Sequence, residues 1–286
     1  MKKLLALMLA MVMALSLVAC GEQAATEPEN TDPQQEQTEA ALTTVTPGKL
    51  TVATSPDFAP YEFYAIDENG TPQLAGFDMA LAQYIADYLS LELEVVPMDF
   101  DGTIMELANK AVDLGMAGYS PDPEREDSMD FSDIYYTGGQ SFVCLQSNKD
   151  LFATLEDTNK AEYQIGAQIG SIQVKLANEN SADADIVELT KVTDIIAELL
   201  AGTLDGAYIE TAVAESYAVN YPELCVVLPV PYDAEGSVVG VSKGNTELLA
   251  GVNEAIAAAL ADGSMDQFVA AANEAASGEI IEGLVD

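Results

Sequence analysis

From residue 48 onward, apolar and polar positions follow two alternating periods. Short apolar runs have the pattern of buried strands, and the stretches between them repeat apolar residues three or four positions apart, as amphipathic helices do. The predicted strands are 50–55, 91–100, 114–119, 163–170, 184–190, 206–210 and 225–230, and the predicted helices are 76–90, 103–113, 171–180, 193–204 and 211–221. Residues 245–277 predict two more helices around an Asp-Gly turn. Such alternation favours an α/β fold built from βαβ units, with sheets rich in parallel strands.

The first twenty residues are organised like a signal peptide. A basic start, MKK, precedes the uncharged run LLALMLAMVMALSLVA, which is short for a spanning helix of about 20 residues. The segment LVAC, which ends at Cys20, resembles a bacterial lipobox. It implies removal of residues 1–19 and lipid attachment to Cys20, which would anchor the protein outside the cytoplasmic membrane. The alternative is an ordinary secretory signal in which the cysteine is incidental.

Residues 20–47 contain no aromatic and no basic residue, and Glu, Gln, Thr, Pro and Ala dominate them. Such a composition cannot bury a core, so this segment is predicted to be disordered. A coil of this length reaches roughly 30 Å. We therefore expect a tether between the lipid anchor and a folded body.

The chain of 286 residues is long enough for two domains, and it is strongly acidic. Ten Lys and Arg residues face 48 Asp and Glu residues, which gives a formal net charge of −38. Nucleic-acid binding needs clustered basic residues, so the charge argues against it, and against an anionic membrane surface as well. The acids are dispersed along the chain, which is typical of a surface that favours solubility.

Two cysteines lie in the predicted body. Cys144 and Cys225 each lie in an apolar, strand-like run, without the close spacing of a zinc or redox site. A disulfide needs Cα atoms within about 7 Å, which sequence alone cannot establish. Buried free thiols are the favoured interpretation, and no metal or cofactor is expected.

Arg125 is the only arginine of the chain, and it follows the predicted strand 114–119 in a loop with two prolines. One interpretation is a surface counter-ion to the neighbouring acids. A lysine would serve that role equally well, however, and the chain uses lysine at its other basic positions. Arginine differs in presenting a planar group that binds a carboxylate through two parallel hydrogen bonds. Arg125 therefore points to a carboxylate ligand.

Three further features fit a small ligand held between two α/β units. Ser171 stands at a predicted helix start, where unpaired amides favour an anion, although simple helix capping explains it equally well. Glu210 ends a strand and could meet an ammonium, or it could be one more solvated carboxylate. The aromatic residues Phe58, Tyr61 and Phe63 follow the first strand, either as core residues or as a face for a ligand.

Several motifs occur together in the order and spacing of a known family. They are TSPDFAPYEF, GFDMALAQYIADYL, VVPMDFDGTI, VDLGMAGYSPDPER, DFSDIYYTGG, IGAQIGS and LDGAYIE, between about residues 48 and 270. The chain thus resembles the bacterial extracellular solute-binding proteins of family 3, the polar-amino-acid receptors of ABC importers. The resemblance implies a periplasmic-binding-protein-like (flytrap) fold of two α/β lobes joined by two crossing hinge strands. Lobe 1 would comprise residues 48–137 and 236–286, and lobe 2 residues 138–235.

The resemblance also implies how an amino-acid carboxylate is held. The arginine of the family's T-x-x-R motif binds it, and Arg125 stands at that position. Asp122 replaces the threonine of the motif. Amides near Ser120 and at Ser171 and Ile172 would help to hold the carboxylate.

The ammonium of the ligand would meet the carbonyl of Gly118, the hydroxyl of Ser120 and the acid at position 210. The family usually has aspartate there, and Glu210 is one methylene longer, which questions either the ammonium geometry or a plain α-amino acid as ligand. The positions that would line the side-chain pocket are Ser55, Phe58 and Phe100.

The partners that this resemblance implies are an amino acid and the permease subunits of an ABC transporter, with the protein acting as a monomer. Two alternatives remain open. Some relatives are dehydratases acting on cyclic acids, and Glu210 or Asp57 could perform acid–base chemistry, but the chain has no histidine and no evident nucleophile–base pair. A sensor domain would need further domains or a spanning helix, neither of which the sequence contains.

Overall fold

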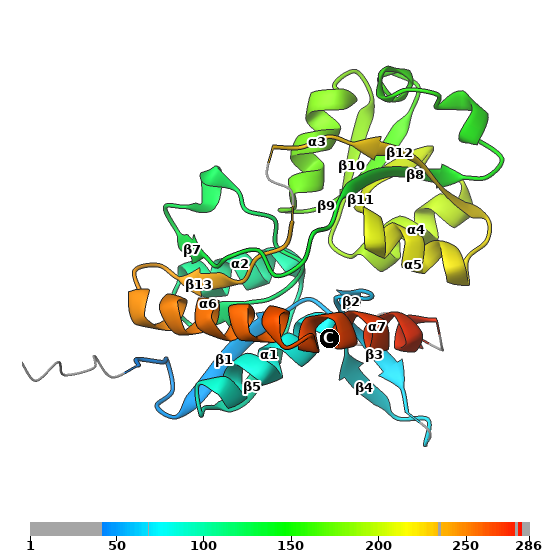
Figure 1. The fold of residues 1–286 in the computed structure, drawn as a ribbon. Helices are drawn as coiled ribbons and strands as arrows, with labels where there is room; N and C mark the ends of the chain where they lie inside the picture. The colour runs from blue at the N-terminus through cyan, green and yellow to red at the C-terminus, as the bar shows by residue number, and fades with distance from the viewer. Residues whose placement is uncertain (1–41, 68, 234–235, 278–279, 282–286) are drawn as a thin grey trace, which may run out of the picture. The chain divides into compact units, whose positions relative to one another are not determined.

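The computed structural model of the chain describes residues 42–67, 69–233, 236–277 and 280–281 (Figure 1). These residues belong to one compact unit, Ala40–Asp286. Two five-stranded sheets and the helices packed on them form most of it. The predicted signal peptide, Cys20 and most of the predicted tether lie outside the described residues.

The first sheet has the strand order β5-β1-β6-β13-β7. Strand β1 runs parallel to β5 and β6, whereas β13 is antiparallel to both β6 and β7. Its strands are β1 (Lys49–Thr54), β5 (Glu92–Pro97), β6 (Leu114–Gly115), β7 (Met129–Phe131) and β13 (Gly240–Ser242). The C-terminal part of the chain thus returns to complete the sheet that the N-terminal part began.

The second sheet has the order β10-β9-β11-β8-β12. Strands β10, β9 and β11 are parallel, and β8 runs antiparallel to its neighbours β11 and β12. Its strands are β8 (Gln140–Leu145), β9 (Gln164–Gln168), β10 (Asp185–Leu189), β11 (Gly206–Glu210) and β12 (Leu224–Val230). Both sheets are therefore mixed, and each has a parallel βαβ part.

Helices connect the parallel strands and pack on the sheets. The α-helices are α1 (Phe77–Tyr88), α2 (Phe100–Ala108), α3 (Ile172–Asn180), α4 (Val192–Ala201), α5 (Thr211–Asn220), α6 (Thr246–Ala261) and α7 (Ser264–Ala276). Three short 3₁₀ helices are Pro123–Arg125, Lys149–Leu151 and Leu155–Thr158. A smaller sheet joins β2 (Asp57–Phe58), β3 (Glu62–Ile66), β4 (Pro72–Ala75) and β14 (Ile280–Ile281).

The chain crosses twice between the two large sheets. It leaves the first sheet after Phe131 and enters the second at Gln140, and it returns between Val230 and Gly240 (Figure 1). The two crossing segments touch through an isolated antiparallel bridge between Tyr136 and Ser237. We refer to the parts that carry the first and second sheets as the first and second lobes.

The predicted alternation of strands and helices is confirmed, but element boundaries differ, two of them by four residues or more. The predicted strand 114–119 is only Leu114–Gly115, because the chain turns at Gly118, whose φ of 59° lies in the left-handed region. The predicted helix 103–113 is Phe100–Ala108, and Lys110 with a φ of 57° prevents its continuation. Strands β7 and β13 were not predicted, because each has only three residues.

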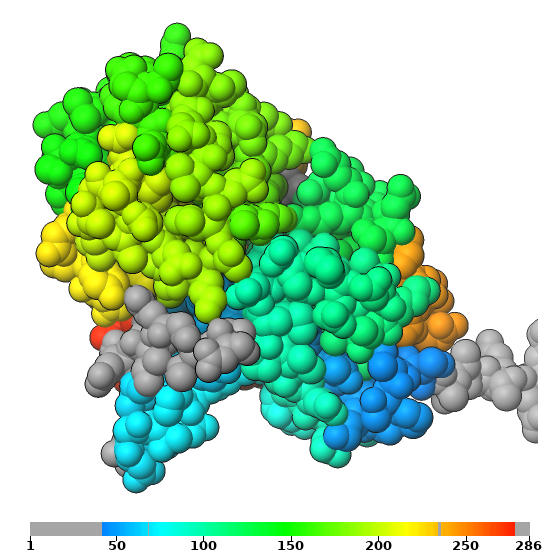
Figure 2. All heavy atoms as spheres, turned by 180° about the vertical axis from the view of Figure 1, so that it is seen from behind, coloured from blue at the N-terminus to red at the C-terminus, as the bar shows by residue number. Residues whose placement is uncertain are grey.

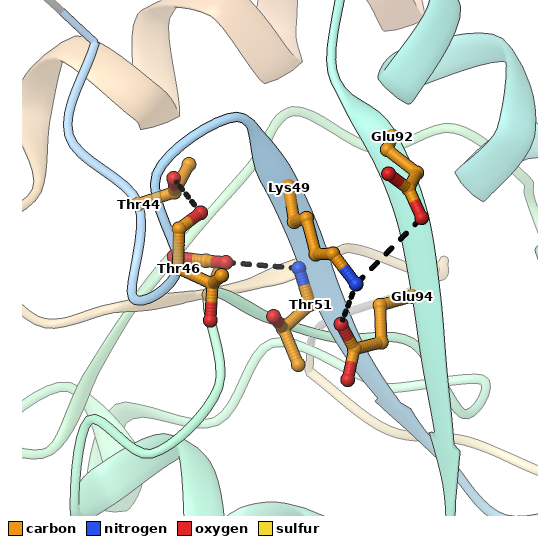
Figure 3. A network of polar contacts seen from close by, with 7 residues as sticks. Thr44, Thr46, Lys49, Thr51, Glu92 and Glu94 are labelled. Atoms are coloured by element: carbon orange, nitrogen blue, oxygen red, sulfur yellow. Dashed lines mark hydrogen bonds and ion pairs between the residues drawn. The ribbon is translucent and has the colours of Figure 1, made fainter.

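The segment before β1 is fastened to the first sheet. The amide of Val45 donates to Asp113 (2.7 Å), and the carbonyl of Thr43 accepts from Asn245 (2.9 Å). Next to it, Lys49 lies between Glu92 and Glu94 at 3.6 and 2.8 Å (Figure 3). The structured body therefore begins before residue 48, inside the segment predicted to be a tether.

Candidate ligand-binding site

Arg125 ends the short 3₁₀ helix that follows β6, and its side chain reaches the second lobe. Its Nη2 donates to the carbonyl oxygen of Gly170 at 2.7 Å. Its Nε lies 3.6 Å from an Asp122 oxygen, and its Cζ lies 5.9 Å from the centroid of the Phe100 ring. The side chain is only 12% exposed, and this burial lowers the pKa of the guanidinium. Arg125 therefore contacts a carboxylate of its own loop, as a counter-ion would, and in addition a backbone carbonyl of the second lobe.

Gly170 leads directly into the N-terminus of α3. Ser171 occupies the N-cap position, but its hydroxyl donates to the carbonyl of Gln168 (2.6 Å) and makes no capping hydrogen bond. The first amides of α3 consequently receive no acceptor from their own N-cap side chain. Such amides, at the positive end of the helix dipole, favour an anion. The amides begin at Ser171, the residue after Gly170. Arg125, which bonds to the carbonyl of Gly170, therefore lies next to them.

Gly118 lies in the loop between β6 and Arg125, and its backbone is hydrogen-bonded to Asp78 of α1. Its amide donates to Asp78 Oδ2 at 3.1 Å, and Tyr135 donates its hydroxyl to Asp78 Oδ1 at 2.6 Å. A Cβ atom at position 118 would lie 2.6 Å from the Phe58 ring. Glycine is therefore required here both for its left-handed φ and for this close approach.

A second buried carboxyl group, that of Glu62, lies beside Asp78. It is completely buried, and neither of its oxygens has a hydrogen-bond donor among the described residues. Burial raises the pKa of Glu62 well above its ordinary value, and Asp78 adds to the effect. Asp78 accepts from the Gly118 amide and the Tyr135 hydroxyl, which favours its ionised form, whereas no described donor does this for Glu62, so the protonated form is favoured at Glu62.

Glu210 ends β11 and is 3% exposed. Its Oε2 accepts from the amide of Val213 (2.9 Å) and caps α5, and its Oε1 accepts from the amide of Gly139 (3.3 Å) in the first crossing segment. Burial raises its pKa to about 7, and the hydrogen bonds, including one with the first-lobe Tyr61, act against that rise. The carboxyl group is thus positioned beside the first crossing segment and close to both lobes.

Asp57 forms another contact between the lobes. One oxygen of this first-lobe residue accepts from the backbone amide of Val192 (2.6 Å) and from the side-chain amide of Gln168 (3.3 Å), both of the second lobe. Ser55 donates its hydroxyl to the other oxygen at 2.9 Å. Asp57 therefore acts as an N-cap for α4, whose own N-cap residue, Lys191, provides no capping hydrogen bond. Burial raises the pKa of Asp57 to about 6.

The aromatic residues predicted for the site lie beside its polar groups. The rings of Phe58 and Tyr61 are 5.4 Å apart, and Phe100 meets Tyr119 edge-to-face at 5.6 Å. In Figure 2 the lime-coloured atoms of the second lobe lie directly against the teal atoms of the first. A cavity of about 340 Å³ opens beside the Arg125 loop, between residues 121–123 and the part of α3 that begins at Ile172.

The residues predicted from the sequence thus fall into two groups. One contains Arg125, Phe100 and the chain around Gly170–Ile172, and the other contains Glu210, Phe58 and Gly118, which meet around Tyr61. Ser120 is buried in the loop that links Gly118 to Arg125.

The structure adds three polar residues that the motifs did not single out for these contacts: Asp57, Gln168 and Asp78. Their signal in the sequence was weak. An acid or amide side chain beside a strand end or in a first helical turn commonly bonds to nearby backbone groups. Its residue type therefore does not indicate a contact with a distant residue.

Comparison with known proteins identifies the family. The family model for bacterial extracellular solute-binding proteins, family 3, matches residues 50–271. The chain belongs to this family. It is 31% identical over 265 residues to the arginine-binding extracellular protein ArtP of Bacillus subtilis, covering 90% of this chain and 92% of that protein. It is also 30% identical over 187 residues to the cyclohexadienyl dehydratase of Pseudomonas aeruginosa, covering 65% of this chain and 68% of that enzyme.

Solved structures show the same two-lobe fold. The amino acid ABC transporter substrate-binding protein AbpA of Streptococcus pneumoniae, bound to L-arginine, matches with a TM-score of 0.77 and 31% identity. The match covers 81% of this chain and 97% of that protein. Because the members of this family are extracellular proteins, the chain functions outside the cytoplasm. Within residues 42–281, as far as they are described, no helix is long and apolar enough to cross a membrane.

The Asp57 contact generates a prediction for pH dependence. Its pKa is raised to about 6 from 3.8, so the native contact binds the proton more tightly than an exposed Asp57 does. Its contribution to stability is therefore complete below pH 4 and is lost as the pH rises through 6. Asp57→Asn keeps the shape of the side chain and removes this titration.

The melting temperatures of the wild type and of Asp57→Asn should be measured from pH 4 to 8 by calorimetry. The difference, wild type minus variant, should fall between pH 4 and 7, and other buried carboxyl groups cancel because both proteins share them. A difference that is constant with pH would show that Asp57 does not titrate in this contact.

Proposed function

We propose that this protein binds an amino acid between its two lobes and delivers it to the permease subunits of an ABC transporter. The observation that carries the proposal is the buried Arg125, which bonds to the carbonyl of Gly170 beside the uncapped N-terminus of α3. A guanidinium and helix-terminal amides at one place form a site for a carboxylate. Relatives named as arginine-binding proteins support an amino acid as the ligand, and basic amino acids are the first to test.

In this proposal the carboxylate of the ligand bonds to Arg125 and to the amides at Ser171 and Ile172, with Ser120 beside them. The Gly170 carbonyl holds the guanidinium in place when the lobes are together. The ion pair with Asp122, at 3.6 Å, holds the other side of the group.

The ammonium of the ligand meets the carbonyl of Gly118, the hydroxyl of Ser120 and the carboxylate of Glu210. The pKa of Glu210 near 7 gives this role a consequence. An arriving ammonium favours the ionised form, so Glu210 releases its proton on binding, and affinity decreases as the pH falls below 7. The extra methylene of Glu210 is accommodated by its bonds to Gly139 and Val213. The side chain of the ligand lies near Ser55, Phe58 and Phe100.

The lobe boundaries belong to the same proposal. Lobe 1 comprises residues 48–137 and 236–286, and lobe 2 residues 138–235. The two crossings and the Tyr136–Ser237 bridge support hinges at these boundaries. Asp57 and Arg125, which bond to the second lobe, would then exchange those bonds for water when the lobes open.

We further infer binding without turnover, by a monomer. One oxygen of Asp57 and both oxygens of Glu210 accept backbone amides, and these bonds occupy acceptor positions that a general base would need. The dehydratase relative keeps an enzyme as the alternative function.

Arg125→Lys tests the carboxylate role. Lysine keeps the charge and loses the planar group, so binding should weaken clearly, whereas a simple counter-ion would tolerate the change. For Arg125→Ala, loss of one partner of a buried pair costs about 2–5 kcal/mol, which corresponds to a roughly thirty- to several-thousand-fold weaker affinity. Titration calorimetry with the tightest-binding amino acid measures both effects.

The matched control is Lys49→Ala, which removes a partly exposed cation whose ion pairs to Glu92 and Glu94 lie on the edge of the first sheet. It should bind like the wild type. A lysine variant of position 125 that also binds like the wild type would remove Arg125 from the site. Chromatography after the titration should recover the ligand unchanged, and a converted product would favour the dehydratase-type function.

The lipid anchor at Cys20 is part of the proposal, and the LVAC segment supports it. Cys20→Ala should release the protein into the medium or leave it unprocessed, because no acceptor for the lipid remains. Fractionation of cells that express the variant measures this. Unchanged membrane attachment of the variant would contradict lipidation at Cys20.

A further inference from the structure

The two cysteines of the described body face each other across adjacent strands. Strands β8 and β12 are antiparallel neighbours, and their register pairs Cys144 directly with Cys225. Directly opposite residues point their side chains to the same face of a sheet. The sequence suggested only two separate apolar runs, 81 positions apart, and the sheet brings their cysteines together.

The hydrogen-bond pattern of the strands fixes the kind of pair. The amide of Gln146 donates to the carbonyl of Glu223, its opposite residue in this register, at 2.7 Å. Hydrogen-bonded and non-hydrogen-bonded pairs alternate along an antiparallel ladder, so Cys144 and Cys225, two positions further, form a hydrogen-bonded pair. The Cα atoms of such a pair are about 5.5 Å apart, a separation that disulfides also have. Both cysteines are free thiols in the structure, and their Cβ atoms, about 5.5 Å apart in such a pair, must approach by about 1 Å to form the bond.

The two thiols differ in their surroundings. Cys144 is completely buried among the apolar residues Phe142 and Phe152, whereas Cys225 is partly exposed on β12, the edge strand of the sheet. Burial raises the pKa of Cys144 to about 12, and Cys225 contributes to the rise. Cys225 is therefore the thiol that external reagents reach first, and Cys144 reacts only after it.

We propose that Cys144 and Cys225 are a modification site, at which a small-molecule or protein disulfide outside the cell oxidises the pair to a cross-strand disulfide. The extracytoplasmic location provides the oxidising surroundings in which such bonds persist. This inference depends on that location and not on the ligand.

The reaction proceeds by two thiol–disulfide exchanges. Cys225 loses its proton, and its sulfur attacks one sulfur of the external disulfide. The external S–S bond breaks, one thiol leaves with a proton, and a mixed disulfide remains on Cys225. Cys144 then loses its proton and attacks the Cys225 sulfur, which releases the second thiol. Two protein S–H bonds are thus replaced by one S–S bond, and the oxidant is reduced to two thiols.

The bond would fasten the edge strand β12 to β8. It closes the chain from residue 144 to residue 225, which contains β9, β10, β11 and the helices between them (Figure 1). A cross-link around a long loop restricts the unfolded chain strongly. Its effect should therefore be seen in the stability of the second lobe and hardly in ligand affinity.

The first experiment maps the bond in the full chain. The protein is incubated folded with oxidised glutathione, alkylated under denaturing conditions, and digested with trypsin without reduction. Cleavage after Arg125, Lys149, Lys191 and Lys243 separates the cysteines into peptides 126–149 and 192–243. Mass spectrometry should find these two peptides linked, and reduction should release both. Complete alkylation of both cysteines, or glutathione that remains on Cys225 alone, would overturn the proposal.

The second experiment measures stability. From the size of the loop we expect oxidation to raise the melting temperature of the wild type by about 5–15 °C. Cys225→Ala, which leaves the buried Cys144 in place, should melt at the same temperature in oxidised and reduced buffer. An equal shift in both proteins would assign the effect to another group. Because the peptide map uses only the wild type, it decides the matter even if the variant does not fold.

Discussion

The hydrogen bond from Arg125 to the carbonyl of Gly170 is the interaction on which the account of the site depends. Six carboxylates lie between positions 117 and 133, and among the described residues the largely buried guanidinium forms an ion pair with one of them, Asp122, at 3.6 Å. It also donates to a backbone carbonyl of the other lobe at 2.7 Å. A carbonyl oxygen orients the group without neutralising it. The positive charge is thus only partly compensated, next to amides that also favour an anion. Such an arrangement has the charge and the donors to accept a carboxylate, which is the role that we propose for it.

Several carboxyl groups are buried in the contact between the lobes and close to it, where desolvation disfavours their negative charge. Asp57, Glu210 and the Glu62–Asp78 pair are all desolvated, and burial raises the pKa of each one. For Asp57, Glu210 and Asp78, backbone amides or a tyrosine hydroxyl partly compensate for this desolvation, whereas Glu62 has no such donor among the described residues. Asp57 and Glu210 accept such amides at the ends of α4 and α5, so the same residues define the helices and the contact between the lobes. Burial thus favours the protonated form of each of these carboxyl groups.

The sequence predicted the alternating elements well, because strands such as β9 and helices such as α4 contain their own periodic signal. It failed where distant partners decide the structure. The three-residue strands β7 and β13 form only because they pair with each other and with β6. Arg125 and Ser171 were recognisable from residue type and loop position, whereas the role of Asp57 depends on Val192, 135 residues away. The cysteine pair could not be recognised for the same reason. It forms because β12 pairs with β8, although β9, β10 and β11 lie between these two strands in the sequence.

The central claim is that the cleft recognises the carboxylate and the ammonium of one amino acid with Arg125 and Glu210. The most direct measurement compares three ligands by titration calorimetry on the wild-type protein: the amino acid that binds most tightly, its deaminated acid and its decarboxylated amine. The account predicts that both analogues bind far more weakly, because each leaves one buried charged group without its partner. If either analogue binds as tightly as the amino acid, the group that it lacks is not recognised and the account is wrong.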